Sequence, residues 1–349
     1  MWFLKKIETK FYLEHMSIER EKLFAIIKQR LPQNVSFIDE IADVLDISYD
    51  AMYRRINGKT LLSFSEAIKL AKFFKISLNG LYNIEDEQNL YVVKRSNSNS
   101  LKGLTTYFNT ITKAAQFLTK FESAELLFAA KDIPVYYLPK NTLYTRFKLF
   151  IFSNIHTDQD SNIAGSFKLQ NFEVSEALMN SSKELIAAFD NTAATEIWND
   201  TTIDSTLSQI YYFYELRVLE KAQAIQICLE LEALIKGIEQ QAVDCYKGIG
   251  KKRKYSLYHN KLIGLNNTAL FRSEKVKTLV VPYTALSYLR IDDPKTCNEV
   301  EAYFSKQLKY SKKICGRAEV ERQLFFTNMY EKIHQLKQQI EVKSLISFM

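Results

Sequence analysis

Apolar residues recur every three or four positions along the first eighty residues, in short runs separated by polar turns. That period is typical of amphipathic helices that bury one face. The first run stops at Leu31, because a residue that precedes proline disfavours the helical conformation. The spacing predicts five short helices: 17–31, one that follows Ser36 and reaches Leu45, 49–56, one that follows Ser63 or Ser65 and reaches Phe74, and 76–81. Ser36 is expected to cap the second of them, and Ser63 or Ser65 the fourth.

The third predicted helix has a clear start and a clear end. Ser48 is a good N-cap residue, and the turn Asn57-Gly58-Lys59-Thr60 follows the helix. Met52 and Ile56 lie one turn apart and are expected to point inward. Four side chains are then expected to face outward: Tyr49, Asp50, Tyr53 and Arg54.

This stretch resembles the lambda-repressor-like (Cro/repressor type) family of helix-turn-helix domains. The resemblance covers some 60 residues and is carried by IADVL, the IS before the third helix, NGKT after it, and AIKLAKFFKISLNGLY. It implies a five-helix bundle whose third helix lies in the major groove of DNA. Carried over, it puts Tyr49, Asp50 and Arg54 at base edges and Ser36, Asn57 and Lys59 at the DNA backbone. The full set of candidate DNA-binding residues is Ser36, Ser48, Tyr49, Asp50, Tyr53, Arg54, Arg55, Asn57, Lys59 and Thr60.

One departure from the family pattern concerns the end of the third helix. The family often has a bulky apolar residue and then an acidic one there, whereas this chain has Arg55 and Ile56. Two interpretations remain open. The helix is rotated slightly, or Arg55 lays its aliphatic part on the core and sends its guanidinium group to a phosphate.

The charge pattern permits DNA binding without requiring it. Arg54, Arg55 and Lys59 form a basic cluster, and residues 1–83 carry 13 Lys and Arg against 10 Asp and Glu, a net of +3. The alternative is a helical packing unit with an ordinary solvated charged face. Because phosphate contacts supply much of the affinity for DNA, so weak a charge favours a homodimer that binds two half-sites.

The remaining chain predicts a second, larger region. Residues 85–100 read as a linker with a short strand at 90–93, and 101–349 as an α+β region, with a further boundary near 200–250 left open. The expected order is helices first, then an antiparallel meander at about 255–283, then two closing helices. A strand is expected at 135–138, and a long helix at 217–246 that either packs in the core or dimerises. The fold class is therefore an all-α helix-turn-helix bundle plus a larger α+β region.

Composition narrows the chemistry. Of the 349 residues 47% are hydrophobic, and no apolar run reaches the roughly 18 residues that a membrane span needs, so a cytoplasmic location without membrane contact is expected. The four cysteines and four histidines lack metal-ligand spacing. The expectation is a protein that is not an enzyme and has neither metal nor cofactor. The sequence leaves one polar pair, Lys131-Asp132, open between a structural and a ligand-binding role.

Two functional hypotheses follow. In the first, the chain is a one-component bacterial transcription regulator that binds double-stranded DNA, dimerises through its second region and responds there to an unidentified small-molecule effector. In the second, it is a DNA-tethered protein-interaction scaffold without such a ligand. A polar-lined cavity in the second region favours the first hypothesis, and a wide exposed apolar patch favours the second.

Overall fold

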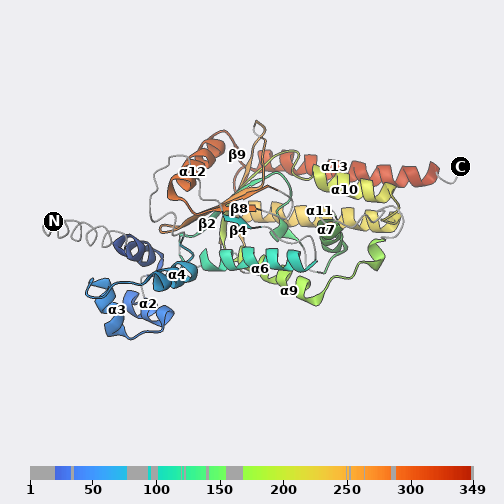
Figure 1. Cartoon of the computed structure of the whole chain (residues 1–349). Coiled ribbons are helices and arrows are strands. Elements are labelled where there is room, and N and C mark those ends of the chain that lie inside the picture. Colours follow the sequence, from blue (N-terminus) through green and yellow to red (C-terminus); the bar gives the residue numbers. More distant parts are fainter. Residues whose placement is uncertain are drawn as a thin grey trace, which may run out of the picture. The chain divides into compact units, whose positions relative to one another are not determined.

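A computed structural model describes residues 20–32, 35–76, 93–95, 101–118, 120–121, 123–138, 141–154, 168–248, 250, 253–262, 264–283 and 288–346 (Figure 1). The chain divides into two compact units, 1–92 and 93–349, each with its own hydrophobic core. The division falls inside the segment read as a linker. Residues 200–250 lie wholly within the second unit.

Unit 1 is a small helical bundle. Its described helices are residues 20–30, α2 (Phe37–Leu45), α3 (Tyr49–Ile56) and α4 (Phe64–Phe73), close to the predicted bounds. The fifth predicted helix, 76–81, lies outside the described residues except for Ile76. The core is formed by Leu23, Phe24, Ile27, Leu31, Ile41, Ala42, Leu45, Met52, Leu70 and Ile76.

Local side-chain chemistry fixes where the helices of unit 1 start. The Ser48 hydroxyl accepts a hydrogen bond from the amide of Ala51 at 3.3 Å, as its N-cap role predicts. Ser63 and Glu66 form a capping box, in which each side chain accepts from the other residue's amide. Ser36 stands at the N-cap position of α2, but its hydroxyl makes no capping hydrogen bond.

Unit 2 is built on a mixed sheet. The path runs β1-β8-β7-β6-β2-β3-β5-β4, and β9 also pairs with β5. The strands are β1 (Val93–Arg95), β2 (Glu125–Ala130), β3 (Ala193–Trp198), β4 (Tyr246–Lys247), β5 (Arg253–His259), β6 (Thr268–Arg272), β7 (Lys277–Pro282), β8 (Tyr288–Ile291) and β9 (Lys312–Lys313).

The prediction of a purely antiparallel sheet is wrong. β6, β7 and β8 do form an antiparallel meander, but β5 does not join it, because β2 and β3 lie between β5 and β6. β2, β3 and β5 are parallel, with Leu127 opposite Thr195 and Thr195 opposite Ser256. Parallel neighbours need long crossover connections, and the helical segments between these strands supply them. Alternating polarity indicates that a segment is a strand, but it does not say which strand it pairs with.

The strand expected at 135–138 is also absent. Residues Val135–Tyr137 form a single 3-10 turn, and the strand lies just upstream, at β2. The turn suits the aromatic residues there, because it lets the hydroxyl groups of Tyr136 and Tyr137 reach the same carboxylate, that of Glu196. Their β-propensity is overridden by this tertiary contact.

Helices cover both faces of the sheet. β6 is buried at four consecutive positions, 268–271, because α6 packs on one side of the sheet and α12 on the other (Figure 1). α10, α11 and α13 pack against one another, and α6 packs along α9. The helices are α6 (Leu101–Leu118), α7 (Leu143–Asn154), α9 (Glu176–Asp190), α10 (Asp204–Glu215), α11 (Lys221–Asp244), α12 (Pro294–Lys309) and α13 (Glu319–Ile346), and a second 3-10 turn spans Leu169–Asn171.

The long predicted helix, now α11, buries its apolar face in the core of unit 2, as the core-packing alternative expected. Ile227, Leu231, Ile235 and Ile238 are at most 1% exposed. All four cysteines are free thiols, and three of them are buried. Among the described residues, no helix is long and apolar enough to cross a membrane.

Gly237 offers a test of the packing around α11. It lies in the helix interior, and a Cβ added to it would meet no atom within 4 Å. Gly237→Ala is therefore expected to raise the free energy of unfolding by roughly 0.5–1 kcal/mol, because alanine favours the helix more than glycine does. Denaturant titration of the full chain measures the change.

Gly248→Ala is the matched control. Its φ is +80°, and the new Cβ would lie 2.5 Å from the carbonyl oxygen of Asp190, so this variant is expected to lose more than about 1 kcal/mol. A loss of stability in Gly237→Ala as well would mean that the face of α11 around Gly237 is covered, contrary to the structure.

Candidate nucleic-acid interface

The outer face of α3 carries four of the predicted DNA-binding residues. Tyr49 and Tyr53 are 49% and 48% exposed, and their rings stack with centroids 6.5 Å apart. Asp50 and Arg54 are exposed beside them. Met52 is fully buried and anchors the helix to the core, so that α3 presents two flat rings, a carboxylate and a guanidinium group to solvent.

The turn after α3 is held by its backbone and leaves side chains outside. The amides of Lys59 and Thr60 both donate to the carbonyl oxygen of Arg54, at 2.9 and 3.2 Å. The Asn57 amide group donates to the carbonyl oxygen of Tyr53 at 2.9 Å. Gly58 makes the turn at φ +72°, a conformation that suits glycine. The side chains of Asn57, Lys59 and Thr60 are exposed next to the end of α3.

Arg55 has a different place from its neighbour Arg54. Its Nη2 lies 2.8 Å from Oε1 of Glu66 in α4, and its Nη1 donates to the carbonyl oxygen of Ala51 at 3.0 Å. The side chain is only 18% exposed. Arg55 thus ties α3 to α4 instead of extending towards a phosphate, and we leave it out of the proposed interface.

The contact with Arg55 lowers the pKa of Glu66. Burial acts to raise the pKa of Glu66, but hydrogen bonds from Arg55 and Ser63 outweigh it and hold the pKa below its ordinary value of 4.5. Glu66 is therefore ionised at neutral pH. It serves both the capping box of α4 and the link to α3.

Arg20 places a guanidinium group where the sequence pattern does not reveal it, although Glu21, 3.7 Å from its Nη2, offsets part of the charge. A Cβ at Gly58 would lie 2.7 Å from Nη1 of Arg20, so the guanidinium group of the first helix sits directly against the turn. The Nε atom of Arg20 is buried and has no hydrogen-bond partner in the protein. Thirty-eight positions separate the two residues in the chain, and no local signal links them.

The predicted serines have distinct surroundings. Ser36 is exposed at the start of α2, where the helix dipole favours an anion, whereas Asp39 and Glu40 in the first turn oppose one. The Ser48 hydroxyl is used as an acceptor in the cap of α3. In all, the exposed set combines hydrogen-bond donors with more positive than negative charge, which suits an anionic polymer that also presents acceptor groups.

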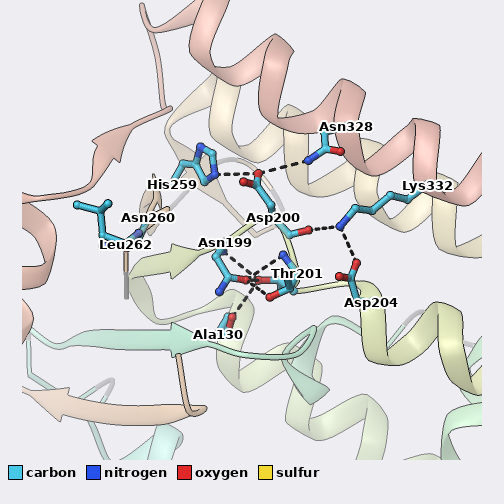
Figure 2. Close-up of polar contacts among 11 residues, drawn as sticks. Ala130, Asn199, Asp200, Thr201, Asp204, His259, Asn260, Leu262, Asn328 and Lys332 are labelled. Atoms are coloured by element: carbon cyan, nitrogen blue, oxygen red, sulfur yellow. Dashed lines mark hydrogen bonds and ion pairs between the residues drawn. The ribbon is translucent and has the colours of Figure 1, made fainter. Parts of the chain in front are cut away.

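In unit 2 a polar junction lies where β3 and β5 end (Figure 2). Oδ1 of Asp200 lies 3.0 Å from Nε2 of His259 and 3.4 Å from Nδ2 of the Asn328 side chain. Lys332 of α13 donates to the carbonyl oxygen of Asp200 and to Asp204, at 2.5 and 2.7 Å. The junction joins β3, β5 and α13, three elements far apart in the chain.

His259 is the titratable centre of this junction. Burial lowers its pKa, and the cations of Lys261 and Lys312 act in the same direction, while Asp200 opposes them. The imidazole is therefore neutral at pH 7, and its Nε2 lies close to Asp200 without forming a hydrogen bond of good geometry. No group of three or more His, Cys, Asp and Glu side chains in the described part of the chain is placed to hold a metal ion.

A second polar group lies inside the core of unit 2. Glu196 is fully buried, and its carboxylate accepts hydrogen bonds from Tyr136 (3.0 Å), Tyr137 (2.8 Å), Trp198 (2.9 Å) and Tyr255 (3.3 Å). Burial raises the pKa of Glu196, and Lys247 opposes this. Burial lowers the pKa of Lys247 to about 8. Every oxygen of the carboxylate is satisfied, as a buried acid requires.

The neighbouring residues Lys131 and Asp132 do not form the buried pair that the sequence left open. Lys131 is exposed, whereas Asp132 accepts a hydrogen bond from Asn267 at 3.2 Å and one from Ser205. Asn267 in turn has a positive φ of 60°, as expected for a turn residue. Asp132 thus holds the turn before β6 against α10, which is a structural role.

The Glu66 contact gives a prediction for unit 1. Because the folded-state pKa is lowered, ionised Glu66 contributes stability above about pH 4.5 that is lost as the pH falls through the folded pKa. Glu66→Gln is expected to cost about 1 kcal/mol at pH 7 and to remove this loss at low pH. Hydrogen exchange of the α3 and α4 amides, variant against wild type at each pH, measures it.

Asp43→Asn, on the exposed side of α2, is the control and should leave this exchange unchanged. If Glu66→Gln exchanges like the wild type at pH 7, the contact with Arg55 does not hold α3 against α4.

Comparison of the chain with known protein families, curated proteins and solved structures finds no match in any of the three. What the protein does has to be inferred from its own residues and their geometry.

Proposed function

We propose that the protein is a sequence-specific DNA-binding transcription regulator, and that unit 1 reads the major groove with α3. The observation that supports this most is the exposed face of α3, where Tyr49, Asp50, Tyr53 and Arg54 stand on a helix fixed by a cap, a tight turn and one buried anchor. A helix of this size fits the major groove, whose base edges carry a distinct pattern of donors and acceptors.

Each exposed side chain has a chemical partner on DNA. Arg54 suits the two acceptors of guanine, Asp50 the amino group of cytosine, and Tyr49 the methyl group of thymine. Lys59, Thr60 and Asn57 border the same face and suit phosphates, as does Ser36 at the start of α2. Arg20 lies beneath the turn, where Glu21 offsets part of its positive charge.

The modest charge of unit 1 favours two copies acting together. One reader with a net charge of +3 gains little from phosphate contacts, whereas a homodimer engages two half-sites about one helical turn apart. In this proposal unit 2 supplies the dimer contact and senses an effector. An effector with unequal affinity for two dimer geometries would shift the DNA-competent population.

The competing proposal is a DNA-tethered scaffold that binds other proteins through unit 2. It draws support from Val320 and Leu324, which lie one turn apart on α13 and are 66% and 69% exposed. Scattered exposed apolar residues are common on soluble domains, so this support is weaker than that for the regulator.

The interface predicts different behaviour for two cations. On a DNA fragment selected for tight binding, Arg54→Ala should weaken binding about 5- to 150-fold, the equivalent of roughly 1–3 kcal/mol, and weaken binding to an unrelated fragment far less. Lys59→Ala should weaken both about equally and reduce the salt slope by about 1. Fluorescence anisotropy at several salt concentrations measures all four affinities.

Lys309→Ala removes the same charge from an exposed position of α12 in unit 2 and is the control. It should change neither affinity by as much as either variant of unit 1. Equal losses on both fragments for Arg54→Ala would place Arg54 on a phosphate and contradict its proposed contact with a base.

A further inference from the structure

A groove in unit 2 lies between α6 and α9, with a cavity volume of about 340 Å³. Its α6 side carries Asn109, Thr112 and Lys113, and its α9 side carries Asn180, Ser181 and Glu184. Thr112 and Ser181 are buried and form its floor, whereas Lys113, Asn180 and Glu184 are exposed on its walls. Polar side chains thus stand on its floor and on both walls, although more of the lining surface is apolar than polar. Its volume is near the lower end for small-molecule sites.

The floor contains a hydroxyl group without a partner. Thr112 is 2% exposed, and its Oγ1 makes no hydrogen bond within the protein. A threonine or serine in a helix commonly donates to the carbonyl four residues earlier. Two neighbours do so: Thr110 to Thr106 at 2.7 Å and Ser181 to Ala177 at 2.9 Å. Thr112 does not, although it is buried beside the groove.

An unsatisfied buried hydroxyl destabilises a folded protein, because it has lost water and gained nothing. A bound molecule that supplies the missing hydrogen bond would remove this cost. Oγ1 is covered by other atoms in this structure. Because Thr112 lines the groove, a change of its χ1 rotamer would bring the hydroxyl group to a ligand there.

The walls add one charge of each sign. Lys113 is on α6 and Glu184 is on α9, and within the described part of the chain neither forms an ion pair. Opposite charges that face a shared cavity without meeting suit a ligand that carries both charges itself. The amide groups of Asn109 and Asn180 can donate to or accept from such a ligand.

We propose that this groove binds a small zwitterion of the amino-acid class. The carboxylate of the ligand lies at Lys113, its ammonium group lies at Glu184, and one of its polar atoms completes the hydrogen bonding of Thr112. The inference deepens the proposed sensing role of unit 2, since it names the class of effector, and it does not depend on DNA binding by unit 1. α6 is the first helix of unit 2, so an occupied groove acts on the helix that is nearest in the sequence to the reader.

Calorimetric titration of the full chain with each of the twenty L-amino acids tests the proposal without DNA. At least one of them should bind. Its amide, which lacks the carboxylate, and its N-acetyl form, which lacks the ammonium group, should each bind at least about tenfold more weakly. Lys113→Ala and Glu184→Ala, both at exposed positions, should have the same effect on the parent amino acid.

Thr112→Val separates a binding role from a structural one. The variant keeps the shape and removes the unpartnered hydroxyl, so the unfolding midpoint of the ligand-free protein should rise while affinity for the amino acid falls about tenfold. Thr110→Val on the same helix, whose hydroxyl is already bonded to the backbone, is the control and should leave the affinity unchanged.

Three results would overturn the proposal: no amino acid binds, binding survives in all three groove variants, or Thr112→Val lowers the unfolding midpoint. Because the titrations contain no DNA, a failure here leaves the proposed function of unit 1 untouched, and a failure of DNA binding leaves the groove untouched.

Discussion

The turn between α2 and α3 sets the direction of the whole reading face. Asp46 adopts a left-handed conformation with φ 59°, and the Ile47 amide donates back to the carbonyl oxygen of Ala42 at 3.1 Å. This closes α2 in the manner of a Schellman motif, with aspartate where glycine is usual. Ser48 then starts α3 at once. Met52 is the buried anchor of α3, so the rotation of the helix about its axis is fixed. That rotation determines which side chains of α3 face solvent.

Unit 2 depends on non-local contacts instead. Its three parallel strands are separated by long helical connections, and polar groups hold the ends of these strands together. Inside the sheet Glu196 gathers three tyrosines and a tryptophan, and at the edge Asp200 links His259 to α13. Such buried networks are costly unless every member is satisfied. Both oxygens of Glu196 are satisfied, which marks that network as structural. Nε2 of His259 and Oγ1 of Thr112, in contrast, are buried without a hydrogen-bond partner.

The helices of unit 1 can be predicted from the sequence because their signals are local: the Ser48 cap, the Ser63–Glu66 capping box and Pro32 all act within a few residues. The parallel order of β2, β3 and β5 cannot be predicted in this way, because alternating polarity contains no information about a partner strand some 60 residues away. The same limit hides the Arg55–Glu66 link, which turns one predicted DNA contact into a brace between helices. The groove between α6 and α9 cannot be predicted from the sequence either, since its two walls are some 70 positions apart and consist of ordinary helix-surface residues.

Selection of bound fragments from a genomic library by the purified full chain, at low and at high salt, tests the proposed reader most directly. A regulator with a fixed α3 face should recover an inverted repeat, with half-sites about one helical turn apart, that survives the higher salt. Binding that ignores sequence and disappears at the higher salt would contradict the proposal. It would mean that the outer face of α3 is a solvated surface and not a reader of bases.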